Sequence, residues 1–288
     1  KSKQDYLDAD NIIKHFTTPE AYQYRSRIWH NYGALEQQDG NENEFVNLIL
    51  TKALPYAEKA GDQKRVAWNY MDLGNIFMEL KSYARAGEYY NKAIDILTIS
   101  DKTASVLAEC YLYSAKSFIL QDKPDTVSSF LKNAYRIISS NKDSSYLPLY
   151  YLTEGMYYGR TKQWQESISA LDKGIMLAQQ QNRQYDEATL WYQKYDTYKR
   201  RNKLAEARPF LEKAYKLSKI YAVTENSRLL LFELARTESA LGHYEAGFNR
   251  MLEYSYLTDS VFALQTAASI AEQESKYRVT EKEKALLA

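Results

Sequence analysis

The chain has 288 residues, of which 26% are charged, and its 38 basic and 37 acidic residues nearly cancel. This balance argues against direct binding of nucleic acid, and a single cysteine, Cys110, excludes an internal disulfide bond and a multi-cysteine metal site. The ten glycines and five prolines are few, and good helix formers are abundant, so the composition predicts an all-α protein. We expect neither a signal peptide nor a membrane span within the sequence, since no run of about 18 apolar residues occurs.

Residues 1–26 precede a repeating region. Ile12, Ile13 and Phe16 are spaced for a short helix, and Thr18-Pro19-Glu20 is typical of a helix start. We expect this segment to be an N-terminal capping helix.

From about residue 27 a pattern of small and aromatic residues returns roughly every 40 positions. It is clearest at Tyr70, Leu73, Gly74 and Phe77, which share one helical face because they are three or four residues apart. Ala86, Tyr90 and Ala93 follow on a second stripe. The pattern predicts stacked helical hairpins, since one hairpin cannot bury its apolar face alone. Six units are expected, starting near residues 27, 67, 108, 148, 188 and 228.

The other units carry equivalent apolar positions on both helices. In chain order these are Gly33, Ala34, Val46, Leu50 and Ala53; Tyr111, Ala115, Phe118, Val127, Leu131 and Ala134; Tyr151, Gly155, Tyr158, Leu171 and Gly174; Trp191, Tyr195, Tyr198, Ala207, Leu211 and Ala214; Leu231, Leu234, Ala235, Gly247 and Met251.

Short polar breaks separate the two stripes of five units and predict the turns of the hairpins. These breaks are Leu80-Lys81-Ser82-Tyr83, Gln121-Asp122-Lys123-Pro124, Thr161-Lys162-Gln163-Trp164, Arg201-Asn202-Lys203-Leu204 and Leu241-Gly242-His243-Tyr244.

The pattern resembles the tetratricopeptide repeat, which has Trp, Leu-Gly and Tyr on its first helix and Ala, Phe and Ala on its second. The match is close from Tyr70 to Ala93, whereas Ser114, Glu154 and Lys194 replace the usual leucine elsewhere. The resemblance implies an all-α, right-handed superhelical solenoid of about six hairpins over residues 27–258. A long charged C-terminal helix or connector is expected over residues 259–288.

The C-terminal stretch contains no Gly or Pro, and Glu272/Lys276 and Glu274/Arg278 are spaced to pair along a helix. It resembles the juncture in bacterial membrane-bound regulators that have an extracytoplasmic tetratricopeptide sensor. The resemblance implies a periplasmic or extracytoplasmic location, a membrane span just beyond residue 288 and a histidine kinase or helix-turn-helix output module. Such a helix could also pair two protomers into a homodimer.

The resemblance also implies a partner-binding inner wall, made by first-helix residues that face away from the second helix. The residues selected are Asn31, Trp68, Met71, Asn75, Met78, Leu112, Tyr113, Lys116, Leu152, Met156, Tyr192, Asp196, Lys199, Phe232 and Arg236. The middle of this set is apolar, and an exposed patch of that kind favours a protein or peptide partner. The alternative is that the chain fills its own groove with residues 259–288 or with a second protomer.

The basic carboxylate clamp of chaperone-tail binders is not expected, although Asn75 is retained. The positions that need basic or amide residues are occupied by Met71, Asp72, Leu112 and Leu152. His15, His30 and His243 lack a metal-binding spacing, and Cys110 fits a small buried position better than a nucleophile. We therefore expect no cofactor, no metal and no catalytic residue.

Two hypotheses follow for a non-enzymatic module. It is the signal-input or scaffold region of a bacterial regulatory protein, or it is a cytoplasmic peptide-sensing domain of a transcriptional regulator. A hydrolase or transferase built across repeats would instead show a deep polar pocket with strongly perturbed carboxylates.

Overall fold

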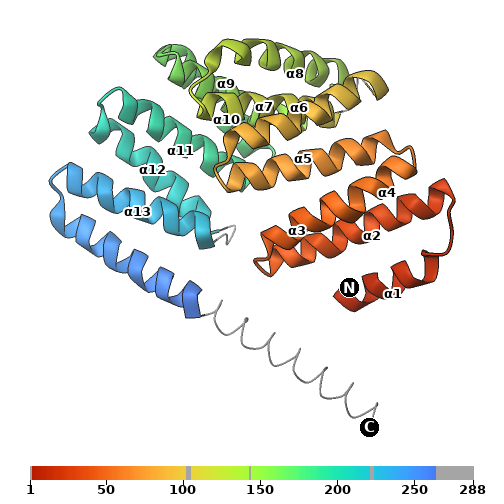
Figure 1. Cartoon of the computed structure of the whole chain (residues 1–288). Coiled ribbons are helices and arrows are strands. Elements are labelled where there is room, and N and C mark those ends of the chain that lie inside the picture. The colour runs from red at the N-terminus through yellow and green to blue at the C-terminus, as the bar shows by residue number, and fades with distance from the viewer. Residues whose placement is uncertain (1, 102–104, 143, 221–223, 264–288) are drawn as a thin grey trace, which may run out of the picture. The chain divides into compact units, whose positions relative to one another are not determined.

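The computed structural model describes residues 2–101, 105–142, 144–220 and 224–263, which form helices and short connections without a strand (Figure 1). The predicted all-α class is confirmed over these ranges. The chain divides into two compact units, one ending at Ala170 and the other beginning at Leu171. The sequence pattern had indicated one continuous array.

The first unit starts with α1 (Lys3–Ile13), α2 (Pro19–Gln38), α3 (Glu42–Leu48), the π-helical segment η1 (Ile49–Ala53) and α4 (Leu54–Lys59). It continues with α5 (Gln63–Glu79), α6 (Tyr83–Ser100), α7 (Ser105–Leu120), the 3-10 turn η2 (Pro124–Thr126) and α8 (Val127–Asn141). The 3-10 turn η3 (Ser144–Tyr146), α9 (Leu147–Arg160) and the start of α10 (Trp164–Gln180) complete it.

The second unit contains the rest of α10, then α11 (Gln184–Arg200), α12 (Leu204–Ser218), α13 (Thr224–Ala240) and a helix over residues 244–263. Within the described ranges, the helices after α1 form six consecutive helix–turn–helix pairs, which confirms the predicted hairpins. Each predicted start, from residue 27 to residue 228, lies in the first helix of one pair.

Each of the five predicted turns closes through one residue in the left-handed region. These residues are Lys81, Asp122, Lys162, Asn202 and Gly242, with φ of 57°, 56°, 62°, 60° and 81°. The backbone N–H of the following residue then donates a hydrogen bond to the carbonyl oxygen five residues earlier, as when Ser82 N donates to Phe77 O at 2.8 Å. This bond satisfies a carbonyl that the helix end would otherwise leave without a partner.

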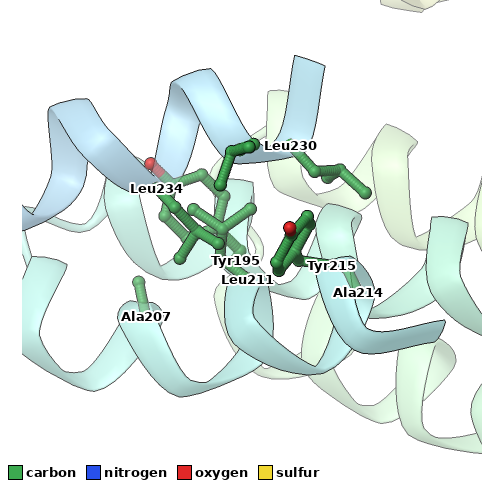
Figure 2. Packing of buried hydrophobic residues seen from close by; sticks show 8 residues of the cluster. Tyr195, Ala207, Leu211, Ala214, Tyr215, Leu230 and Leu234 are labelled. Atoms are coloured by element: carbon green, nitrogen blue, oxygen red, sulfur yellow. The ribbon is translucent and has the colours of Figure 1, made fainter. Parts of the chain in front are cut away.

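The predicted stripes form the cores. In the second unit, Tyr195, Leu211, Ala214 and Leu234 lie together with their neighbours from α11, α12 and α13 (Figure 2). All four are at most 1% exposed. In the first unit, Cys110 is fully buried, as expected, and burial raises the pKa of its thiol.

The first hairpin departs from the predicted pattern. Its second helix is interrupted by η1, where Leu54 N donates to Ile49 O instead of the carbonyl four residues back. Pro55 accounts for the interruption, because it has no N–H and its ring disturbs the preceding turn. The register shifts, so Phe45 is buried whereas Leu50, predicted to be buried, is 40% exposed. The prediction for Leu50 is wrong.

The N-terminal helix α1 is held to α2 by charges. Arg25 donates to Asp10 at 2.7 Å and 3.2 Å, and Lys3 lies 2.8 Å from Glu36. Ile12 and Phe16, the apolar residues of the predicted helix, are exposed. Helix α2 begins at Pro19, inside the predicted capping segment of residues 1–26.

Residues 264–288, the main part of the predicted charged helix, lie outside the described residues. Among the helices that the structure describes, none is both long and apolar enough to cross a membrane.

Candidate partner-binding surface

The predicted wall residues all lie on the first helices of hairpins. In the first unit they are Asn31 on α2, Trp68, Met71, Asn75 and Met78 on α5, Leu112, Tyr113 and Lys116 on α7, and Leu152 and Met156 on α9. In the second unit they are Tyr192, Asp196 and Lys199 on α11, and Phe232 and Arg236 on α13. We describe one wall for each unit.

Three residues in the apolar middle of the predicted surface are buried. Leu112, Leu152 and Met156 are 0%, 5% and 8% exposed. Helix α9 packs directly against α7, so these first helices cover side chains that were expected to face a partner. The prediction that these three side chains form an exposed patch is wrong, and they act as core residues.

In the first unit, the exposed part of the wall centres on Trp68, whose side chain is 43% exposed. The guanidinium of Arg65 lies 4.9 Å from the centre of the Trp68 ring, in a cation–π contact. Helix α2 contacts α5 through a polar pair, in which His30 Nε2 lies 2.8 Å from Asp72 Oδ2. An exposed aromatic ring therefore lies beside a charged side chain on α5, and α2 contacts the same helix.

Asn75 and Tyr113 are positioned by a tyrosine of the second helix. The hydroxyl of the buried Tyr90 donates to Asn75 Oδ1 at 2.8 Å, and the rings of Tyr90 and Tyr113 stack with centres 5.6 Å apart. Lys116 lies on the same wall, and burial lowers the pKa of its amine. Repeat packing thus fixes the orientation of wall residues.

In the second unit, Tyr192 and Phe232 are 40% and 37% exposed. Glu233, the residue after Phe232, accepts a hydrogen bond from the Tyr195 hydroxyl at 2.7 Å and forms an ion pair with Lys199. Burial alone would raise the pKa of Glu233, but these donors hold it below its ordinary value. The wall therefore presents aromatic rings around an ordered charge network.

Two further ion pairs border this network. Arg236 Nη1 lies 3.6 Å from Glu233 Oε2, and Arg200 Nε donates to Asp196 Oδ2 at 2.5 Å. The predicted residues Asp196, Lys199 and Arg236 are thus all engaged in ion pairs beside the exposed rings.

A pocket of about 250 Å³ adjoins Tyr192 on the same helices. It is lined by Tyr185, Ala188, Thr189, Tyr192, Asn226, Leu229 and Leu230. Burial raises the pKa of Tyr192 to about 12, so its hydroxyl stays neutral and can donate a hydrogen bond. Of the lining residues, the sequence pattern selected only Tyr192. The sequence did contain a signal for the pocket residues of α11. Three- and four-residue spacing places Tyr185, Ala188 and Thr189 on the same helical face as Tyr192.

A second hollow of about 450 Å³ lies among α12, α13 and the helix over residues 244–263. Its carboxylate, Glu253, accepts from the Tyr215 hydroxyl at 2.5 Å, and the pKa of Glu253 is lowered by that bond and by Arg250, against the effect of burial. Among the described residues that line these two hollows, Glu253 is the carboxylate, and its pKa lies below the ordinary value. Within the described ranges, no group of three or more His, Cys, Asp and Glu side chains is placed to hold a metal ion.

Comparison with known proteins places a tetratricopeptide repeat at residues 69–96. No curated protein matches the chain. Among solved structures, Rap protein complexed with Competence and Sporulation Factor is similar with a TM-score of 0.66 and 13% identity, over 89% of this chain and 70% of that one. NprR in complex with its cognate peptide NprX has a TM-score of 0.62 and 13% identity, over 98% and 82% of the two chains.

A third similar structure is a Signal Transduction ATPase with Numerous Domains protein from Pyrococcus horikoshii, which has a tetratricopeptide repeat sensor. It has a TM-score of 0.58 and 15% identity over 92% of this chain, which spans 42% of that protein. Identities this low establish the fold alone. Residues 69–96 are thus a tetratricopeptide repeat, and the chain has the fold of tetratricopeptide-repeat proteins.

Proposed function

We propose that this chain is a non-enzymatic module that binds a protein or peptide on the first-helix walls of its hairpins. The observation that carries the proposal is the exposure of Trp68, Tyr192 and Phe232 at wall positions beside ordered charged groups. Aromatic side chains that are exposed next to fixed polar groups are common anchors in peptide recognition. The structure of NprR in complex with its cognate peptide NprX, which shares this fold, supports a peptide as the partner, and the Rap protein complexed with Competence and Sporulation Factor supports a bound partner.

The test is selection of a random-peptide phage library against the purified chain, followed by calorimetry with the selected peptides. We expect Trp68→Ala, or Tyr192→Ala combined with Phe232→Ala, to weaken binding at least about tenfold, the size of an anchor-residue effect. The control is Tyr135→Ala, which removes an exposed aromatic side chain from α8, the second helix of its hairpin. Equal affinities for wall variants and control would reject the walls as the binding surface.

At a finer level, we propose that the module is the signal-input or scaffold region of a bacterial regulatory protein and works outside the cytoplasm. The support is the resemblance of the stretch from Asp259 onward to the sensor–membrane juncture of such regulators. A cytoplasmic peptide-sensing domain of a transcriptional regulator is the alternative. Sequencing the full gene separates them, because a signal peptide before and a membrane span after this region favour the first, and an adjoining DNA-binding domain favours the second.

We further propose self-association through the helix over residues 244–263. Tyr244, Phe248, Leu252 and Tyr256, spaced four residues apart on this helix, are 74%, 63%, 40% and 71% exposed. Forty residues earlier on α12, the positions of Phe248 and Leu252 are charged and pair with the following hairpin, through Arg208–Glu238 and Arg250–Glu212.

On the preceding hairpin, this face of the second helix carries charged residues that pair with the next hairpin. On the hairpin that ends with residues 244–263, the same face is apolar and exposed. A second copy offers a matching partner, because an isologous contact pairs an apolar stripe with itself.

A further inference from the structure

The pocket beside Tyr192 combines a fixed, buried side with exposed rings. Leu230 belongs to the core cluster of Figure 2, and Ala188 is 2% exposed, so neither residue is free to move into the space. Tyr185, Tyr192 and Leu229, which also line the pocket, are each at least 40% exposed. The volume of about 250 Å³ suits one substituted ring rather than a larger ligand. Two tyrosine rings supply surface against which an aromatic ligand can pack.

The described residues that line this pocket are all of types that carry no charge at pH 7. The charges nearest to Tyr192 are already paired, Glu233 with Lys199 and Asp196 with Arg200. A charged ligand would therefore lose its hydration without gaining an ion pair inside the pocket, which is unfavourable. The lining selects for a neutral ligand.

Three lining residues from two helices carry hydrogen-bonding groups. Thr189 Oγ1 donates to the backbone oxygen of Tyr185 at 2.9 Å, so this hydroxyl has its donor engaged. Within the part of the chain that the structure describes, the Tyr192 hydroxyl and the Asn226 amide have no hydrogen-bond partner. Both groups can donate as well as accept, and a ligand hydroxyl, which also does both, matches them.

We propose that the pocket between α11 and α13 binds an uncharged phenol, that is, an aromatic ring with one hydroxyl group. The ring packs against Tyr185, Leu229 and Leu230, and its hydroxyl exchanges hydrogen bonds with Tyr192 and Asn226. The same chemistry can come from a free small molecule or from a tyrosine side chain of a bound peptide. The inference goes beyond the proposed function, because a free phenol binds without any peptide.

The test is fluorine NMR of the whole chain with 4-fluorophenol, which is neutral at pH 7. We expect its signal to shift saturably with a Kd on the order of 1 mM. 4-Fluorotoluene, which lacks the hydroxyl group, should bind about fivefold more weakly, the size of a hydrogen-bond effect. The anion 4-fluorobenzoate should bind at least about tenfold more weakly, because its charge gains no partner. Equal affinity for all three probes would overturn the proposal.

Variants at the pocket locate the bound ring. Tyr192→Phe and Asn226→Leu remove a hydrogen-bonding group but keep similar volume, and each should weaken 4-fluorophenol about threefold or more without affecting 4-fluorotoluene. Leu229→Asp, at an exposed position, should abolish binding of both probes by placing a charge beside the ring. The control is Tyr135→Phe, the same change at an exposed tyrosine of α8. Unchanged affinity in all three pocket variants, with intact helicity by circular dichroism, would overturn the assignment of the pocket.

Competition against 4-fluorophenol identifies the source of the phenol. Stronger displacement by p-cresol indicates a free molecule, stronger displacement by N-acetyl-tyrosine amide indicates a peptide side chain, and either result supports the pocket. Failure of every phenol to bind, while selected peptides still depend on Tyr192 and Phe232, rejects the phenol pocket alone. Loss of all wall-dependent peptide capture, while 4-fluorophenol still binds, rejects the proposed function alone.

Discussion

The ring of Tyr90 on α6 occupies the space that a side chain at Gly74 on α5 would need. A Cβ atom at Gly74 would lie 2.4 Å from Cε1 of Tyr90, far closer than carbon atoms can approach. From this position the Tyr90 hydroxyl reaches across the helix to Asn75 Oδ1. One small–aromatic pair of the repeat thus packs the hairpin and also fixes a residue of the wall.

Gly74→Ala should therefore destabilise the first unit by about 2 kcal/mol, even though alanine is ordinarily the better helix former. The ring of Tyr90 must move, and its hydrogen bond to Asn75 is weakened. Chemical denaturation measures the loss. Gly87→Ala on α6 is the control, because the nearest atom to its Cβ would be the Ser117 hydroxyl oxygen, at 3.0 Å. Equal or greater stability of Gly74→Ala would contradict the packing argument.

Lys81→Gly should stabilise the chain by about 0.5–1 kcal/mol. Lys81 has φ of 57° in the turn between α5 and α6, a conformation that costs a residue with a Cβ but not glycine. Thermal unfolding measures the gain. Lys81→Ala, which removes the charge but keeps a Cβ, should give no comparable gain in stability. An equal gain from both changes would show that removal of the charge is responsible.

Arg208→Met should cost about 3 kcal/mol at pH 7, because it leaves a buried carboxylate without its arginine. Arg208 Nε donates to Glu238 at 2.6 Å, and the Glu238 side chain is 2% exposed. Burial would raise the pKa of Glu238, but Arg208 and His243 together lower it. Arg200→Met, which breaks the more exposed pair with Asp196, should cost less than about 1 kcal/mol.

The pH dependence gives a second check on Glu238. Because the folded-state pKa lies below the ordinary value near 4.5, its stabilisation is present above that pH and is lost as the pH falls through the folded pKa. Without Arg208, burial dominates and protonation relieves the cost. The loss caused by Arg208→Met should therefore shrink between pH 7 and pH 4 in urea titrations. A loss that stays constant with pH would show that packing, not charge, is responsible.

Phe248→Glu combined with Tyr256→Glu should abolish self-association, since it places charges on the exposed stripe of residues 244–263. Sedimentation velocity measures the mass, and the unchanged chain should sediment as a dimer at micromolar concentration. Ile99→Glu, at an exposed apolar position on α6, should leave the dimer intact. A monomeric unchanged chain would contradict the proposed pairing.

The local features of the fold could be predicted from the sequence, because they depend on residues close together in the chain. The spacing of Gly74 and the later Tyr90 indicated a packed hairpin, and Lys81 lies in a break that proved to be a turn. The prediction that Leu50 is buried was wrong, because the π-helical segment before Pro55 changes which residues face the core. A pattern with fixed spacing does not account for this change.

The wall was harder to predict, because exposure depends on contacts between helices that are distant in sequence. Leu112 and Met156 occupy wall positions by period, yet the packing of α9 on α7 buries them. Trp68 and Tyr192 were predicted because both their repeat positions and their residue types set them apart.

Photo-crosslinking with a selected peptide that carries benzophenone, followed by mass spectrometry of the adducts, locates the bound partner directly. We expect adducts on the first helices, at or beside Trp68 on α5 and Tyr192 or Phe232 on α11 and α13. Trp68→Ala and Tyr192→Ala should reduce the adducts of their own unit. Adducts confined to second helices such as α6 and α12, unaffected by either change, would contradict the claim that partners bind the first-helix walls.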